Sequence, residues 1–347
     1  MTAPLRVAVI GLGDISTVHL AAIADSADAV LVGVCDPDDV RRDAVATAAG
    51  VEGYADHRDL LDRAAPDVVH ICTPHFTHSD IAVDALERGV NVILEKPLAA
   101  TRDEGQRVVD AAATSTARIA VCFQNRYNTA VQRAKEILDS GELGAVRGAW
   151  ATVLWHRSPD YYRASPWRGT WAGGGGGLLM NQAIHTVDLV QWLVGEVTHV
   201  AGSAGTRALG DTIEVEDTAD LVLTHANGAR SVLFATVAHI DNEPVAIEIT
   251  AEHGRLILKG DLEIIRADGS REIVSEDAMG TGERAYWGGA HVRLITDFHR
   301  SLGEPGPFWI DAAAAQKSLE IIQDVYDQSF PHRRVPAPAS HEWSTTS

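Results

Sequence analysis

A glycine turn between a short apolar segment and a helical segment limits the fold of this chain more than any other feature. Residues 5–10 are apolar except for Arg6, and the hexapeptide GLGDIS follows at residues 11–16. A second apolar segment ends at Asp36, at the spacing of roughly 20 residues that the dinucleotide-binding fingerprint requires. Gly11 allows the tight turn, and Gly13 lets a pyrophosphate approach the backbone at the positive end of the helix. Strand, glycine turn, helix, strand and acid in this order predict a dinucleotide-binding βαβ unit.

The acid at the end of the second segment indicates which dinucleotide binds. Asp36 is expected to accept hydrogen bonds from the adenosine ribose hydroxyls and to repel a 2′-phosphate, so NAD is favoured over NADP. Arg41 and Arg42 could contact a phosphate, but we interpret them as the solvent-exposed face of the next helix. Asp14 and Ile15, at the start of the first helix, are also predicted to contact NAD.

Strand-like and helix-like segments continue to alternate up to residue 123. Residues 68–72, 90–94 and 119–123 are mainly apolar and strand-like, and helical segments separate them. This alternation predicts an α/β Rossmann domain over residues 1–123, with a doubly wound parallel sheet whose ligand lies at the carboxyl ends of the strands. The residues that follow these strands are therefore predicted to contact the cofactor: Thr73, Pro74, His75, His78, Glu95, Lys96 and Gln124.

Lys96 is one of only four lysines in a chain with 25 arginines. A desolvated lysine can release and accept a proton, whereas arginine stays protonated. A lysine kept directly after an apolar strand therefore suggests proton transfer, with an ordinary surface lysine as the alternative.

The composition disfavours several classes of protein. The formal net charge of −19 argues against nucleic acid or an anionic membrane as a partner. No apolar segment approaches the roughly 20 residues of a membrane helix, and no signal peptide is expected. Cys35, Cys72 and Cys122 lie in apolar segments without a Cys-x-x-Cys pair, as is typical of reduced thiols in a cytoplasmic protein.

The spacing of His70, Cys72, His75 and His78 raises the question of a zinc site. His70 and Cys72 would share one face of a strand, but the other two lie beyond a proline turn, and no second ligand pair follows. We therefore expect no metal, and we expect His75 and His78 to lie in the loop that lines the cofactor.

The second half of the chain has a different pattern. After a helical segment at residues 129–140, long strand-like segments follow one another with few helices between them. Asn227-Gly228 between two of them is typical of a hairpin turn. The pattern predicts an α+β domain over residues 124–330, with a large, open, mainly antiparallel sheet, and a C-terminal tail at residues 331–347.

Five consecutive glycines, residues 173–177, precede a helix with a polar stripe. Asn181, His185 and Asp188 share one helical face because they are four and three residues apart. His185 could exchange a proton, with Asp188 one turn away to orient it. The alternatives are a flexible linker for the glycines and a solvent-exposed face for the stripe.

Large aromatic residues are concentrated just before the glycines. Six lie within residues 150–171: Trp150, Trp155, Tyr161, Tyr162, Trp167 and Trp171. Flat aromatic faces beside Arg157, Arg163 and Arg168 suit a sugar or cyclitol, whose C–H faces stack and whose hydroxyls form hydrogen bonds. Packing in the core or at a subunit interface is the alternative.

Together these motifs resemble the Gfo/Idh/MocA oxidoreductase family. The resemblance covers nearly the whole chain and rests on the N-terminal glycine turn, on Glu95-Lys96-Pro97, and on Gly175-Gly176-Gly177 followed by Asn181, His185 and Asp188. It implies NAD(P)-dependent oxidation or reduction at a secondary alcohol of a sugar, inositol or related polyol. It also implies a homodimer or homotetramer formed through the C-terminal sheet.

The same resemblance implies roles for individual residues. Lys96 and His185 match the proton-transfer positions, and Asp188 and Asn181 complete the expected catalytic set. Many members have Asp where this chain has Asn181, which can bind a hydroxyl but cannot act as a base, so proton transfer should fall to Lys96 and His185. The segment from Tyr161 to Trp171 looks most like the branch that contains nucleotide-sugar 3-dehydrogenases. The expected substrate contacts are Arg126, Tyr161, Trp167, Arg168, Asn181 and His185.

Two other functions remain open within the resemblance. Some relatives keep NAD bound and use transient oxidation to cleave glycosides, which makes them redox-neutral glycosidases. Others are non-catalytic NAD-binding regulators, a role that the presence of Lys96, His185 and Asp188 disfavours.

Overall fold

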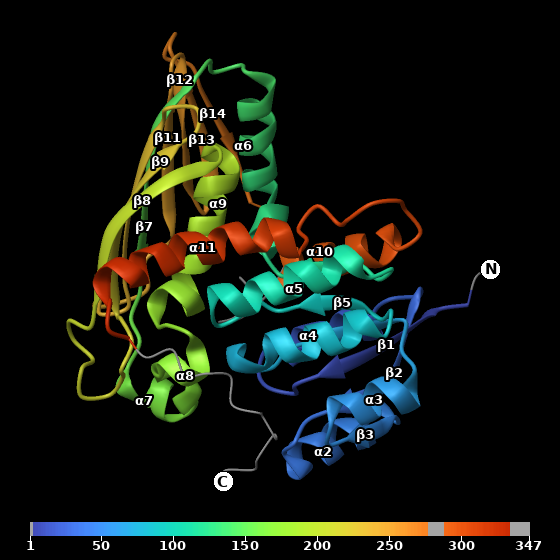
Figure 1. The fold of residues 1–347 in the computed structure, drawn as a ribbon. Coiled ribbons are helices and arrows are strands. Elements are labelled where there is room, and N and C mark those ends of the chain that lie inside the picture. The colour runs from blue at the N-terminus through green and yellow to red at the C-terminus, as the bar shows by residue number, and fades with distance from the viewer. Residues whose placement is uncertain (1–2, 277–287, 334–347) are drawn as a thin grey trace. The chain divides into compact units, whose positions relative to one another are not determined.

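The computed structural model describes residues 3–276 and 288–333, which form two compact units (Figure 1). The first unit contains described residues 3–124 and 288–316, and the second contains residues 125–276 and 317–333. The chain therefore returns to the first unit after it has completed the sheet of the second. Most of the predicted C-terminal tail, residues 334–347, lies outside the described residues. Among the residues described, no helix has the length and apolar content needed to cross a membrane.

The first unit is built on a six-stranded sheet in the order β3-β2-β1-β4-β5-β6. Every pair in it is parallel, so the predicted doubly wound sheet is confirmed. The strand order reverses between β1 and β4, and ligands of such sheets bind at this switch point, beyond the carboxyl ends of the strands. The strands are β1 (Leu5–Ile10), β2 (Ala29–Cys35), β3 (Glu52–Tyr54), β4 (Val68–Ile71), β5 (Asn91–Leu94) and β6 (Ile119–Val121).

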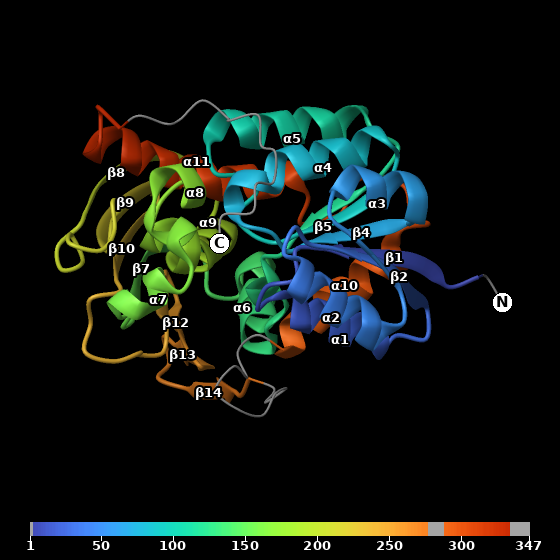
Figure 2. The same cartoon turned by 90° about the horizontal axis from the view of Figure 1, so that it is seen from below.

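Helices cover both faces of this sheet. Figure 2 shows α3, α4 and α5 on one face and α1, α2 and α10 on the other. Because both faces are covered, β4 and the end of β5 are buried, and apart from His70 their residues are apolar, as expected for parallel strands. The helices are α1 (Ser16–Ala24), α2 (Asp39–Ala49), α3 (His57–Ala64), α4 (His78–Glu87), α5 (Arg102–Thr114) and α10 (Gly288–Ser301).

Local signals in the sequence account for where the helices begin. The hydroxyl of Thr101 accepts a hydrogen bond from the backbone of Glu104, whose carboxylate accepts one from the backbone of Thr101. This reciprocal capping box satisfies two backbone donors at the start of α5. Asp38 caps α2 in the simpler way, by accepting a hydrogen bond from the backbone of Arg41.

The second unit is built on an eight-stranded sheet in the order β14-β13-β12-β11-β7-β10-β9-β8. Only the β7–β10 pair is parallel, so the sheet is mainly antiparallel, as predicted. The predicted hairpin at Asn227-Gly228 joins β9 and β10. The strands are β7 (Val146–Leu154), β8 (Val197–Gly205), β9 (Thr218–His225), β10 (Arg230–Thr236), β11 (Ala246–Ala251), β12 (Gly254–Lys259), β13 (Asp261–Arg266) and β14 (Arg271–Val274).

The two faces of this second sheet differ. Helices α6 and α9 pack on one of them (Figure 1). In β10 the side chains alternate, with Ser231, Leu233 and Ala235 buried and the large apolar residues Val232 and Phe234 exposed. The remaining helices are α6 (Thr129–Ser140), α7 (Pro159–Arg163), α8 (Trp171–Gly174), α9 (Ile184–Val194) and α11 (Ala312–Ser329), which enters the second unit at Lys317.

The helix predicted after the glycines is not a continuous α-helix. A π-helical segment, Leu179–Ala183, precedes α9. Asn181 therefore lies in the π-helical segment, whereas His185 and Asp188 lie in the α-helix that follows it. Such insertions occur frequently at functional sites.

Candidate active site

The glycine turn after β1 has one glycine that packing requires and one that borders open space. Gly11 has a φ of +86°, and a Cβ on it would lie 2.7 Å from the carbonyl carbon of Cys72. A Cβ on Gly13 would meet nothing within 4 Å. The open space lies at the N-terminus of α1, where a pyrophosphate is favoured by the helix dipole. The turn therefore fits a bound dinucleotide.

Asp36 closes this turn from the end of β2. Its carboxylate accepts hydrogen bonds from the backbone of Leu12 at 2.8 Å and of Asp38 at 3.0 Å. Arg41 Nη1 lies 3.3 Å from Asp36 Oδ2, so Arg41 contacts the predicted ribose-binding acid instead of only facing solvent. The backbone bonds fix the carboxylate at the edge of the sheet where the fold predicts an adenosine ribose.

The loops after β4 and β5 are tied together by His78. Its Nδ1 lies 2.7 Å from the carbonyl oxygen of Pro97, and its Nε2 lies 2.9 Å from that of Thr73. The ring is completely buried. It therefore holds Thr73 and Pro97 in place from behind, which is a positioning role, whereas the sequence suggested direct contact with a cofactor. His75 is also buried, with its ring centroid 5.7 Å from that of His78.

Glu95 directs its carboxylate into the first unit. Oε1 lies 3.1 Å from Nε2 of His19 and 3.2 Å from Nε2 of His291. Burial alone would raise the pKa of this carboxyl, but the hydrogen bonds from the two imidazoles hold the pKa well below its usual range. Lys96 follows at the carboxyl end of β5 and is half-buried. Glu95 and Lys96 were both predicted to contact the cofactor. The carboxylate of Glu95 is instead hydrogen-bonded inside the unit, whereas Lys96 is half-buried.

Gln124 offers a polar atom that the protein leaves unused. It follows β6 and is 5% exposed, and its Oε1 has no hydrogen-bond partner among the described residues. A buried acceptor without a partner costs on the order of 1–3 kcal/mol. A ligand that donates a hydrogen bond at this edge would remove that cost, which is a second indication that the residues fit a cofactor.

In the second unit, the glycine run is required by packing. A Cβ on Gly176 would lie 2.1 Å from the hydroxyl of Tyr326, and a Cβ on Gly177 would lie 2.1 Å from the backbone oxygen of Glu216. Real Cβ atoms do not approach other atoms so closely, so neither position has room for a side chain. The segment is a packed turn, and the flexible-linker alternative is excluded.

Glu216 holds this turn and was not predicted from the sequence. Its carboxylate accepts hydrogen bonds from the backbone of Gly177 at 2.9 Å, the backbone of Leu179 at 2.7 Å and the hydroxyl of Tyr326 at 2.7 Å. Burial raises its pKa to about 7, although these three donors favour the ionised form. No local pattern marks Glu216, because its partners lie far away in sequence.

The residues of the predicted polar stripe have different partners. The side-chain amide of Asn181 donates to the backbone oxygen of Gly177 at 3.2 Å. Asp188 is 1% exposed and forms a two-pronged ion pair with Arg126, and Ser318 donates a further hydrogen bond to it. Arg126 was predicted to bind substrate and Asp188 to orient His185. The structure instead commits their charges to each other.

The aromatic segment separates into a cluster and several packing residues. Arg168 lies over the rings of Tyr161, at 4.7 Å, and of Trp167, at 5.5 Å. These three predicted substrate contacts are therefore together. Tyr162, by contrast, is buried with Ile213 and Val215 in the core. Trp171 packs at 5.1 Å on Tyr326, and Trp150 is an exposed residue of β7.

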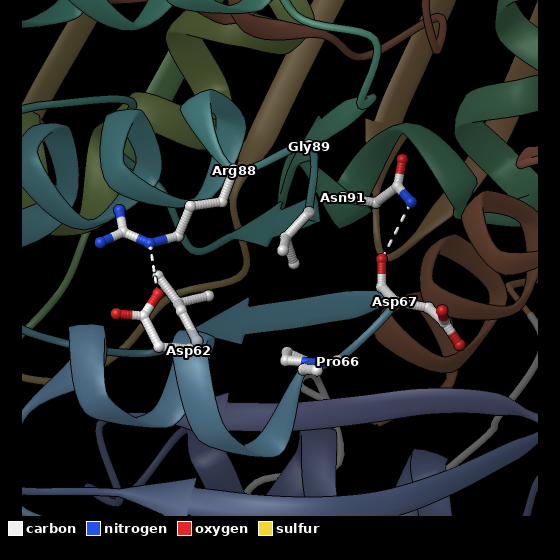
Figure 3. Close-up of a pocket in the computed structure, with 9 residues that line it drawn as sticks. Asp62, Pro66, Asp67, Arg88, Gly89 and Asn91 are labelled. Carbon is white, nitrogen blue, oxygen red and sulfur yellow. Dashed lines mark hydrogen bonds and ion pairs between the residues drawn. The ribbon is translucent and has the colours of Figure 1, made fainter.

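A surface hollow of the first unit lies at the opposite edge of its sheet (Figure 3). It is lined by the loops that precede β4 and β5, including Pro66, Asp67, Arg88 and Asn91. Arg88 and Asp62 form an ion pair across it, and Asn91 donates to the backbone oxygen of Asp67. None of the predicted site residues lines this hollow. The predicted cofactor contacts instead follow the carboxyl ends of the strands of this sheet.

Comparison with known proteins gives matches over both units. Residues 5–123 match the model of an oxidoreductase family with an NAD-binding Rossmann fold, and residues 131–257 match the GFO/IDH/MocA C-terminal domain. D-apiose dehydrogenase of Paraburkholderia graminis is 30% identical over 76% of this chain and 70% of its own. Levoglucosan dehydrogenase of Pseudarthrobacter phenanthrenivorans is 31% identical over 58% of either chain.

A solved structure covers more of the chain. The WlbA dehydrogenase from Bordetella pertussis, in complex with NADH and UDP-GlcNAcA, superimposes with a TM-score of 0.83 at 28% identity. The superposition covers 97% of this chain and 100% of that one.

Proposed function

The chain belongs to the Gfo/Idh/MocA family of NAD-binding oxidoreductases, and we propose that it is a dehydrogenase that acts on a secondary hydroxyl of a sugar, glycoside or cyclitol. When bound, NAD accepts or returns the hydride. The protein's own part is to bind and orient the two reactants and to hold the proton at Lys96 or His185. The substrate class is supported by relatives that are sugar dehydrogenases.

The observation that carries the proposal is that three residues of the first unit lie at the same edge of its sheet. Gly13 with its open space, the fixed carboxylate of Asp36 and Lys96 all follow carboxyl ends of strands in one parallel sheet. The amides at the start of α1 and Asp36 would hold the dinucleotide. Lys96 is the proton-transferring group on the same edge, because a half-buried ammonium can give up a proton that an arginine would keep.

In the second unit, we assign substrate contacts to the cluster of Tyr161, Trp167 and Arg168. Aromatic faces stack on the C–H face of a pyranose or cyclitol ring, and a guanidinium donates to its oxygens. Asn181 would bind a substrate hydroxyl without accepting its proton, so His185 is the proton-exchanging residue of this unit. Arg126 and Asp188 are positioning residues, since their charges satisfy each other.

The experiment that tests the proposal is nicotinamide absorbance with NAD or NADP against a panel of pyranoses, glycosides and inositols. Lys96→Ala should abolish turnover and leave the Kd for NAD nearly unchanged. Lys259→Ala, an exposed lysine on β12, is the matched control and should leave both unchanged. Parallel loss of NAD binding in Lys96→Ala would remove the assigned role. Release of an aglycone without net NADH would identify the redox-neutral glycosidase instead.

We further propose that the chain forms a homodimer or homotetramer through its second sheet. Trp150 on β7 pairs with Val232 on β10, and both are about half exposed, as is Phe234. Clustered large apolar residues on an open sheet face are typical of an association surface. Trp150→Glu should lower the mass measured by light scattering to that of a smaller assembly; an unchanged mass would contradict this surface.

The buried free thiols fit a reducing compartment, for which we propose the cytoplasm.

A further inference from the structure

A cluster of buried imidazoles surrounds Glu95 inside the first unit. His19 lies on α1, His70 on β4, and His291 and His299 on α10. Each of these side chains and Glu95 is at most 8% exposed. The proposed hydride and proton transfer uses none of the four histidines. Four histidines and a carboxylate in one buried cluster need an explanation beyond ordinary core packing, because histidine is only intermediate in burial and glutamate is almost never buried without a partner.

Three donor atoms of the cluster have the spacing of ligands around one ion. Nε2 of His19 and Nε2 of His291 lie 3.1 Å and 3.2 Å from the same carboxylate oxygen, Oε1 of Glu95. All three atoms lie within 4.8 Å of one another. In a tetrahedral site with bonds of roughly 2.0–2.2 Å, neighbouring ligand atoms are about 3.3 Å apart. We propose that His19, Glu95 and His291 form a buried site for one divalent transition-metal ion of the zinc class.

The surroundings of His19 support this assignment. A metal-bound histidine usually donates its other ring N–H to an acceptor, which fixes the tautomer. Nδ1 of His19 lies 3.0 Å from Nδ1 of His70, and Nε2 of His70 lies 3.2 Å from Nε2 of His299. With a metal on Nε2 of His19, each ring can be neutral and donate one hydrogen bond to the next. The chain of donors then runs from the metal ligand to α10 without a conflict.

The charge and the donor types indicate which ion would bind. Glu95 buries a negative charge, and a divalent cation would compensate it, as buried charges require. Nitrogen ligands favour zinc-class ions, whereas Mg²⁺ and Ca²⁺ prefer oxygen. The buried thiol of Cys122, directly after β6, lies close enough to Glu95 to form a hydrogen bond with it. The ion would join α1 and α10 to the end of β5, directly before Lys96.

The test measures metal content in the full-length protein, prepared without a polyhistidine tag. After treatment with a chelator and addition of Zn²⁺, elemental analysis should find about one ion per chain, and Co²⁺ should give the visible absorption of a tetrahedral site. His291→Gln should lose the ion. His239→Gln is the matched control, because His239 forms an exposed contact of 3.1 Å with Asp241, and it should bind as wild type. His70→Gln should weaken binding by roughly 10- to 100-fold, because His70 is the hydrogen-bond partner of the ligand His19.

Thermal unfolding supplies a readout that does not depend on the variants. Removal of the ion from the wild type should lower its Tm, and Zn²⁺ should restore it, because a ligand of the folded state stabilises that state. A wild type with no more bound metal than His291→Gln, or a Tm that neither chelator nor Zn²⁺ changes, would overturn the proposal and leave a hydrogen-bonded network. Because no substrate is used, failure here is independent of the dehydrogenase assignment.

Discussion

Arg126 and Asp188 form a buried, two-pronged ion pair in the second unit. Nε of Arg126 lies 2.8 Å from Oδ2 of Asp188, and Nη2 lies 2.6 Å from Oδ1. Their side chains are 3% and 1% exposed. The guanidinium also lies over the ring of Trp192, at 5.2 Å. Two residues that the sequence suggested for substrate binding and catalysis therefore lock α9 to the segment that precedes α6.

We expect a single substitution in this pair to lower the stability of the protein strongly. Asp188→Ala should lower the free energy of unfolding by roughly 3–5 kcal/mol, because it leaves the Arg126 charge buried without its carboxylate. The double variant Arg126→Met/Asp188→Ala should lose less than the sum of the two single variants, since both charges are removed together. Urea denaturation of Asp188→Ala, Arg126→Met and the double variant measures these free energies.

An exposed ion pair of the same unit provides the control. Arg163 and Asp160 lie 2.8 Å apart on α7, with both side chains well exposed. Arg163→Ala should change the urea midpoint little, because exposed pairs contribute little to stability. Equal losses in Arg163→Ala and Asp188→Ala, or additive losses in the double variant, would show that burial does not set the strength of the pair.

The same pair illustrates which parts of this molecule could be predicted from its sequence. The β-α alternation and the hairpin at Asn227 depend on neighbours in the chain, and both were predicted. The spacing along α9 placed Asp188 near His185, but its carboxylate is paired with Arg126, 62 residues away. A side-chain spacing along one helix shows what shares a face and says nothing of what packs on that face.

The buried carboxylates show the same limit more clearly. Glu95 contacts His19 and His291, which are 76 and 196 residues away in the chain. His291 lies on α10, which belongs to the first unit although it follows the second sheet in the chain. No local sequence pattern predicts this. Glu216 meets the glycine turn from 39 residues further on. Only the folded chain reveals such partners.

The two glycines of the first turn should respond differently to alanine. In Gly11→Ala the methyl group would lie 2.7 Å from backbone atoms at a φ of +86°, so we expect a loss of at least about 2 kcal/mol in the free energy of unfolding. In Gly13→Ala the methyl group would enter open space, and stability should stay within about 0.5 kcal/mol of the wild type. The Kd of Gly13→Ala for NAD should nevertheless rise at least about tenfold, because the methyl occupies the approach of the pyrophosphate.

Chemical denaturation and a fluorescence titration with NAD separate these two effects. Unchanged NAD affinity in a folded Gly13→Ala protein would mean that the pyrophosphate lies elsewhere. Full stability of Gly11→Ala would contradict the close packing of this turn on the end of β4.

Asp36 and Arg41 should together set the preference between the two dinucleotides. In the wild type, Arg41 contacts Asp36 at 3.3 Å. Asp36→Ser removes the carboxylate that would repel a 2′-phosphate, and it leaves Arg41 able to contact that phosphate. A charged hydrogen bond contributes about 1.5–3 kcal/mol, so the ratio of NADP to NAD affinity should rise by roughly 10- to 100-fold. Calorimetric titration with both dinucleotides measures the ratio. Asp36→Ser/Arg41→Ala should lose most of the gain, and an unchanged ratio in the single variant would contradict the role of Asp36.

Glu216 should make the stability of the protein depend on pH. Burial raises its pKa from the ordinary value of 4.5 to about 7 in the folded state. Between these two values the folded protein holds a proton that the unfolded chain has released, so the free energy of unfolding must fall as the pH rises through this window. Glu216→Gln resembles the protonated acid and cannot titrate. It keeps an amide oxygen as acceptor for Leu179 and Tyr326.

Relative to Glu216→Gln, we therefore expect the wild type to lose roughly 2–3 kcal/mol of stability between about pH 5 and about pH 8. Other titrating groups are common to both proteins and cancel in the difference between two urea titrations. A difference that does not change with pH would show that the folded protein holds Glu216 ionised throughout. In that case the hydrogen bonds from Gly177, Leu179 and Tyr326 would outweigh the cost of burying its charge.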